Sequence, residues 1–147
     1  MKLLSLYHNV DLLNRKTVLD LIEVNDKAKI LDLGCSDGLF ALRIAEKANT
    51  KEIFGIEFLK EAAQRAARRG IKVCQADLNR TLPLAAESFD VVHANQVIEH
   101  LSETDRFIKE VYRILKPGGY AVISTPNLAS LHNIFSLILG KQPFSAH

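Results

Sequence analysis

The chain has 147 residues, 48% of them hydrophobic and 24% charged, and its 19 basic and 17 acidic residues leave a net charge of +2. This length and composition are those of one ordinary globular domain, and the charge balance gives no strong signal for nucleic acid. The sequence has no signal-peptide pattern and no apolar run long enough to span a membrane. We therefore expect a cytoplasmic protein, or at most one peripheral to a membrane.

The two cysteines, Cys35 and Cys74, fall in a predicted turn and a predicted strand, and their spacing fits neither a disulfide framework nor a metal site. They are expected to be structural thiols in a reducing compartment. Three arginines cluster at Arg65, Arg68 and Arg69, which is typical of one solvated helix face.

Helices and strands are predicted to alternate along the chain. Hydrophobic periodicity predicts a helix over 10–24, a strand over 29–33, a helix over 38–48, a strand over 52–57, a helix over 61–69 and a strand over 71–76. A loop over 78–88, a strand over 89–94, a helix over 103–115, a turn over 116–119 and a strand over 120–124 follow.

This alternation predicts right-handed βαβ units and an α/β fold with a doubly wound, mostly parallel, Rossmann-like sheet of about five strands. For this sheet we expect the order 3-2-1-4-5, without the usual strands 6 and 7. We divide the single domain into an N-terminal helical segment (1–26), a core (27–127) and an apolar C-terminal helix or tail (128–147).

The chain is organised around the turn between the first strand and the next helix. Gly34 lets the chain leave the strand at backbone angles closed to other residues, and Gly38 is expected to let the helix start pass close to a ligand. The free N–H groups of that helix start suit a polar or anionic group. A dinucleotide fingerprint would need glycines where Ser36 and Leu39 stand, so an NAD-dependent reductase is the disfavoured alternative.

An acidic residue stands at or just past the carboxyl end of each of the first three predicted strands, namely Asp32, Glu57 and Asp77. In an open α/β sheet, ligands bind outside the carboxyl ends of the strands. Glu57 is placed where an ionised carboxylate can accept both hydroxyls of a ribose. The alternative is a surface acid that caps a helix.

Six segments resemble, in order and spacing, the small class I S-adenosylmethionine (SAM) methyltransferases of type 11/12. The resemblance covers residues 27–127 and departs from the usual motif at the middle glycine, which is Ser36. These segments are Leu31–Cys35, Gly55–Glu57, Ala76–Leu78, Phe89–Val92, Val97–Leu101 and Leu115–Gly119.

The resemblance implies a site for SAM, with S-adenosylhomocysteine as product. It implies that the turn from Gly34 through Cys35 and Ser36 to Gly38 holds the methionine part, with Asp32 reaching its ammonium through water. The remaining implied roles are ribose binding by Glu57, adenine contacts by Phe58, Asp77 and the Leu78 N–H, and contacts along the SAM chain by Asn95 and Gln96.

The implied reaction is an S_N2 methyl transfer to a small-molecule, lipid or quinone-like acceptor. The protein must mainly hold the acceptor in line and exclude water. A general base is needed only for a protonated acceptor, and His100 is the candidate. The alternative is that His100 packs at a helix cap.

A second resemblance concerns the metal site of RNA 3′-end 2′-O-methyltransferases, which hold a divalent ion on Glu-x-x-Glu-His plus a further histidine. Here Glu99 and His100 match the motif, and His147, far downstream, could be the further histidine. The position of the first glutamate is taken by Gln96, a neutral and weaker ligand for a hard cation. We therefore expect no metal.

The class I sheet usually has two further strands after the fifth, and too few residues remain here for them. We therefore expect a C-terminally truncated chain, with a SAM-binding module that lacks independent catalysis as an alternative function. The fifth strand lacks charge and would be an edge, and residues 128–139 are strongly apolar. These features predict a homodimer through both segments, or else a helix that packs on its own sheet.

Overall fold

The computed structural model describes the backbone of residues 2–127 and the side chains of residues 11–127. The apolar tail predicted over 128–147 therefore lies outside the described residues. The helices are α1 (Lys2–Asp20), α2 (Leu39–Ala48), α3 (Lys60–Arg68), the 3₁₀ turn η1 (Ile98–His100) and α4 (Thr104–Ile114). The strands are β1 (Ile30–Leu33), β2 (Ile53–Glu57), β3 (Lys72–Gln75), β4 (Phe89–Asn95) and β5 (Leu115–Ser124).

The five described strands form one parallel sheet in the order β3-β2-β1-β4-β5, which confirms the predicted topology. The order reverses direction at β1, which pairs with β2 on one side and β4 on the other. In such sheets the crevice for a ligand opens at this reversal, outside the carboxyl ends of the strands.

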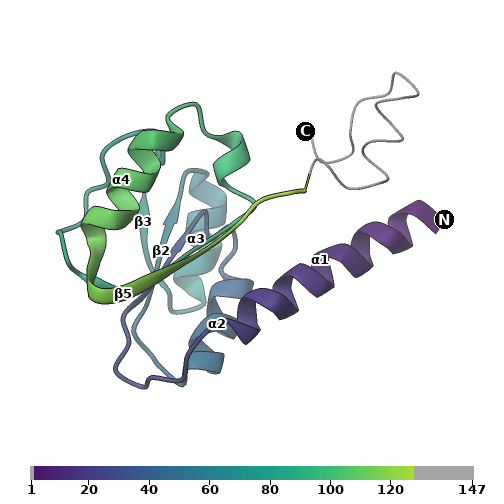
Figure 1. Ribbon diagram of the computed structural model, residues 1–147, viewed down its shortest axis with the longest axis horizontal. Helices are drawn as coiled ribbons and strands as arrows, with labels where there is room; N and C mark the ends of the chain where they lie inside the picture. Colours follow the sequence, from purple (N-terminus) through teal and green to yellow (C-terminus); the bar gives the residue numbers. More distant parts are fainter. Residues whose placement is uncertain (1, 128–147) are drawn as a thin grey trace.

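Helices cover both faces of the sheet (Figure 1). Alternate residues of each central strand face opposite sides. One face carries Ile30 and Val91 and packs against α1, α2 and α3, while the other carries Leu31 and Val92 and packs against α4. The amino-terminal part of α1 projects away from the body of the molecule (Figure 1). Within residues 2–127, every helix is too short or too polar to cross a membrane.

Two element boundaries differ from the sequence prediction. The helix predicted over 10–24 runs from Lys2 to Asp20, so it begins a full two turns earlier and ends before Leu21. The turn predicted over 116–119 lies inside β5, because Leu115 already pairs with Phe89 and Tyr120 with Val91. The residues between these two pairs bulge from the ladder, with Gly118 at a φ of 81°.

Candidate functional site

The turn after β1 takes the tight course that its glycines predicted. Gly34 has a φ of 77°, and a Cβ there would lie 2.8 Å from Cγ2 of Val97, so a side chain is excluded by both angle and space. Gly38 has a φ of 83° and ends the turn as the N-cap of α2. A Cβ at Gly38 would collide with Ile71 and Ala66, so packing against the α3 region also requires glycine here.

Glu57 binds this turn through its carboxylate. Oε2 accepts the Ser36 N–H and Oε1 accepts the Leu59 N–H, both at 2.8 Å, and the residue is 9% exposed. Leu59 is the N-cap residue of α3, so Glu57 also bonds the backbone at the start of this helix, but as a buried residue rather than as a surface acid. A carboxylate oxygen has a second lone pair, however, and Glu57 retains acceptor capacity for a hydroxyl.

Two residues at the carboxyl edge of the sheet have left-handed backbone angles without being glycine. Ser36 has a φ of 49° and Gln96 a φ of 56°, and each follows the end of a central strand. Such angles cost free energy and concentrate at ligand sites. The Glu57 carboxylate holds Ser36 in place, and the Ser124 carbonyl accepts the N–H of Gln96 at 2.9 Å.

A cavity of about 260 Å³ opens beside the turn, and we call it the turn cavity. It contains four of the predicted site residues from the turn and β1, and Asn95 from β4. Its lining is Arg15, Asp32, Gly34, Cys35, Ser36, Asp37, Leu39, Phe40, His93 and Asn95.

Asp32 forms a buried pair with His93 at the floor of the turn cavity. Oδ1 of Asp32 lies 2.6 Å from Nδ1 of His93, and the two side chains are 5% and 2% exposed. The residues are opposite each other in the β1–β4 register. Sequence reasoning missed His93. The sequence did hold one indication of this pair. His93 lies two residues after Val91, so the two share one face of β4, and β4 pairs with β1, which carries Asp32.

Arg15 of α1 is the second lining residue that the sequence did not indicate. Its guanidinium lies 5.1 Å from the centroid of the Phe40 ring and donates to Asp11 at 2.8 Å. The turn cavity thus places a cation from α1 and the anion Asp32 around the same space. An α-amino acid carries an ammonium group and a carboxylate, which Asp32 and Arg15 complement in charge.

Cys35 is a structural thiol in this wall. It is 4% exposed, and burial, followed by the charges of Asp32 and Glu57, raises the pKa of its thiol to about 12. A Cβ on Gly55 would lie 2.5 Å from the Cys35 sulfur, so the thiol fills space that β2 leaves open. Both cysteines are free, as expected.

The other predicted site residues lie around the rim. Asn95, which the sequence placed past the fourth strand, is the last residue of β4 and accepts hydrogen bonds from Asn14 of α1 at 2.6 Å and from Ser124. Phe58 is 63% exposed beyond β2, and Asp77 accepts the Asn79 N–H at 2.9 Å within its own loop beside Leu78. Gln96 contacts the Ser124 hydroxyl at 3.4 Å.

His100 lies apart from the turn cavity. It ends η1, is exposed, and donates its backbone N–H to the Val97 carbonyl at 3.0 Å. It does not line the turn cavity. Its imidazole is therefore available on the surface that follows β4, where either an acceptor or solvent can reach it.

Metal ligands are not gathered in the part of the chain that the structure describes: no three His, Cys, Asp or Glu side chains within it could hold an ion together. His147, the third residue of the metal alternative, lies outside the described residues.

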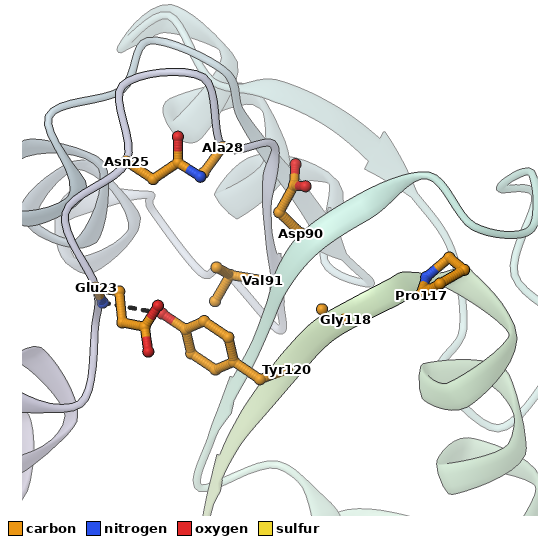
Figure 2. A pocket seen from close by; sticks show the side chains of 9 residues that line it. Glu23, Asn25, Ala28, Asp90, Val91, Pro117, Gly118 and Tyr120 are labelled. Carbon is orange, nitrogen blue, oxygen red and sulfur yellow. Dashed lines mark hydrogen bonds between the residues drawn. The ribbon is translucent and has the colours of Figure 1, made fainter.

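A second cavity, of about 150 Å³, lies at the opposite, amino end of the sheet. Figure 2 shows the Tyr120 ring closing it, with the Glu23 N–H donating to the Tyr120 hydroxyl at 2.9 Å. Asp90 on its rim bonds the Lys29 N–H at 2.8 Å and the Lys116 ammonium at 2.7 Å. These contacts join β1, β4 and β5, so this end of the sheet is structural.

A family model described as a methyltransferase domain matches residues 31–123, more than half of the chain. The chain belongs to the class I SAM-dependent methyltransferase family. A mitochondrial ubiquinone biosynthesis O-methyltransferase of Rattus norvegicus is 32% identical over 125 residues, covering 78% of this chain and 35% of the rat protein. A probable SAM-dependent methyltransferase of Mycolicibacterium smegmatis is 37% identical over 100 residues, covering 67% of this chain and 38% of its own.

The fold of this methyltransferase also matches solved structures. A SAM-dependent methyltransferase of Thermotoga maritima, described as a possible histamine N-methyltransferase, superposes with a TM-score of 0.67 at 25% identity, over 93% of this chain and 65% of that one. The chain spans little more than a third of the two curated relatives, at 35% and 38% of their lengths. The cofactor of the family is SAM.

Proposed function

We propose that this chain binds SAM with its amino-acid end in the turn cavity and transfers the methyl group to a small-molecule acceptor. One observation carries the proposal: Asp32 and Arg15, of opposite charge, line one cavity beside the glycine turn. Asp32 suits the α-ammonium group of the cofactor and Arg15 its carboxylate.

The size of the turn cavity supports this orientation. Its volume of about 260 Å³ lies below the roughly 300–1,000 Å³ of sites that enclose a drug-sized ligand. It therefore suits the amino-acid end, and the nucleoside extends along the edge towards β2 and β3. There Glu57 would accept the ribose hydroxyls, with Phe58, Asp77 and the Leu78 N–H around the adenine.

SAM supplies a methyl group already activated on a sulfonium. The chain's own residues therefore have to fix the cofactor, align the acceptor and exclude water. Asn95 and Gln96 would border the cofactor chain from the end of β4. His100, exposed after η1, would take the proton of a hydroxyl acceptor.

For the acceptor we propose a quinone-like phenol. The rat relative is named a ubiquinone biosynthesis O-methyltransferase, and so is a relative from Rickettsia prowazekii that is 26% identical over 145 residues. A phenol is an acceptor that requires removal of a proton, which is the case in which a base such as His100 is needed.

Calorimetric titration with SAM and with NAD tests the cofactor. We expect saturable binding of SAM and none of NAD, and the reverse would contradict the assignment. Labelled SAM with a catechol or a hydroxyquinol then tests transfer. The His100→Ala variant should bind SAM as the native chain does and lose about 10²- to 10⁴-fold in rate if His100 is the base. Equal losses of binding and rate would show a structural role.

The second candidate is a SAM-binding module without catalysis of its own. The observation that favours it is the share of its relatives that this chain spans, 35% and 38%. SAM binding with no transfer to any acceptor in a screen of extract metabolites would support this candidate.

We also propose that two chains associate. β5 is an edge strand of the described sheet, and it pairs only with β4. The partner would be a second copy of this chain, through β5 and the 128–139 segment, which lies outside the described residues. The free thiols of Cys35 and Cys74 are those of a protein in a reducing cytoplasm, which is the compartment we propose.

A further inference from the structure

His93 is the most buried titratable residue of the turn cavity. It is 1% exposed, and its ring stacks at a tilt on Phe40 with the centroids 5.4 Å apart. Nδ1 is bonded to Asp32, whereas Nε2 has no hydrogen-bond partner among the residues that the structure describes. The same ring lines the turn cavity.

The bond to Asp32 assigns the proton of the neutral ring. A carboxylate only accepts hydrogen bonds, so Nδ1 carries the hydrogen and Nε2 presents a lone pair. A buried acceptor is rarely left without a donor in a folded protein. A donor brought by a ligand in the turn cavity meets this requirement.

We propose that His93 is a binding residue for the amino-acid end of the cofactor, an inference that rests on the proposed function. Its Nδ1–H holds the Asp32 carboxylate, and its Nε2 accepts a hydrogen bond from the α-ammonium group. Asp32 and His93 then act as one acceptor site for that group, opposite Arg15.

Two substitutions distinguish the role of Nδ1 from that of Nε2 in His93. His93→Asn keeps a donor near Asp32 and removes Nε2, and His93→Phe removes both nitrogens while keeping a ring against Phe40. The control is Phe107→Leu, a buried residue of the α4 side of the sheet, which lowers stability without touching the turn cavity. Each is titrated by calorimetry with SAM, with S-adenosylhomocysteine and with methylthioadenosine, which lacks the amino-acid end.

We expect His93→Asn to weaken SAM and S-adenosylhomocysteine by about 10-fold or more and to leave methylthioadenosine unchanged. His93→Phe should lose at least as much, and Phe107→Leu should match the native chain. Equal losses for all three ligands, or no loss, would overturn the role of His93. In either case, SAM binding by the native chain would still support the proposed function. A native chain that bound no SAM would overturn the proposed function itself.

A measurement on the native chain covers the case of a variant that fails to fold. The ¹⁵N resonance of Nε2 of His93 should shift on addition of S-adenosylhomocysteine and stay in place on addition of methylthioadenosine. A resonance that responds equally to both ligands would overturn the proposal.

Discussion

Glu57 joins the glycine turn to the start of α3, because its two oxygens accept the N–H groups of Ser36 and Leu59. A carboxylate can do this and accept ribose hydroxyls at once, whereas an amide has one oxygen and two donors. The structural bonds and the proposed binding contacts therefore depend on the same side chain, and any substitution here must be judged on both stability and affinity.

Glu57→Gln should weaken SAM by about 10- to 100-fold and lower the unfolding free energy by about 1–3 kcal/mol, since one backbone N–H then faces an amide donor. Calorimetry and chemical denaturation measure the two effects. Glu61→Gln, an exposed change in the first turn of α3, is the control and should stay within about 0.5 kcal/mol of the native chain. Unchanged SAM affinity in Glu57→Gln would contradict the ribose assignment.

Cys35 should resist alkylation in the native chain. With its thiol pKa raised to about 12, only about one molecule in 10⁴ carries the reactive thiolate at pH 8. Mass spectrometry after iodoacetamide treatment should show modification at the half-buried Cys74 first and at Cys35 only after unfolding. Equal rates at both positions in the folded chain would show that the wall of the turn cavity opens.

At the scale of elements, a partly buried ion pair between Glu110 and Arg113 fixes the long loop before β4 to α4. Glu110 accepts the Leu82 N–H at 2.8 Å and bonds the Arg113 guanidinium at 2.8 and 2.7 Å. Arg113 in turn donates to the Leu84 carbonyl at 2.7 Å and to the Leu82 carbonyl at 3.2 Å. The hydrogen bond from Arg113, and then the bond from the Leu82 N–H, hold the pKa of Glu110 below its usual range against the opposing effect of burial.

Glu110→Ala should cost about 1–3 kcal/mol of unfolding free energy at pH 7, because it leaves the Leu82 N–H and Arg113 without their acceptor. A carboxyl with a lowered pKa in the fold stabilises the protein above its unfolded pKa and loses that contribution as the pH falls. The gap between native and variant should therefore be full at neutral pH and close below about pH 4.5, the ordinary value for this group. Glu103→Ala, whose carboxylate lies 3.8 Å from Arg106 on the exposed side of α4, is the control and should show little change at any pH.

At the scale of the whole molecule, the open question is what covers the outer edge of β5. The strand is ten residues long and parallel to β4, and its other edge is unpaired within the described sheet. Its last five residues, 120–124, carry no charge, and an unpaired edge without charge is a template for another strand. Ala121 on this edge is exposed and carries no side chain that would block an approaching chain.

Sedimentation should show a dimer of the intact chain that dissociates when Ile134→Lys and Ile138→Lys are introduced together. Both positions belong to the apolar segment that the sequence alone indicates. The Ile108→Lys change, at an exposed position of α4, is the control and should leave association intact. A monomer at every concentration of the intact chain would contradict the proposed dimer.

The sequence by itself determined the sheet order, the glycine turn and the family. Strand and helix periods are local, and a βαβ chain has only one favoured hand, so the alternation of apolar runs predicted a parallel, doubly wound sheet. The motifs that resemble the family then pointed to the strand order. Asp32, Glu57 and Asp77 could be placed at one edge for the same reason, because parallel strands bring their carboxyl ends together.

Only the tertiary structure decided which side chains meet at that edge. The Asp32–His93 pair depends on the register between β1 and β4, which are separated in the sequence by two strands and three connections, and no local pattern sets that register. Arg15 reaches the turn cavity because α1 packs against α2, and Gly38 is required by Ile71 and Ala66 across the sheet face. Each of these is a contact between residues distant in sequence, fixed by packing rather than by the propensity of either partner.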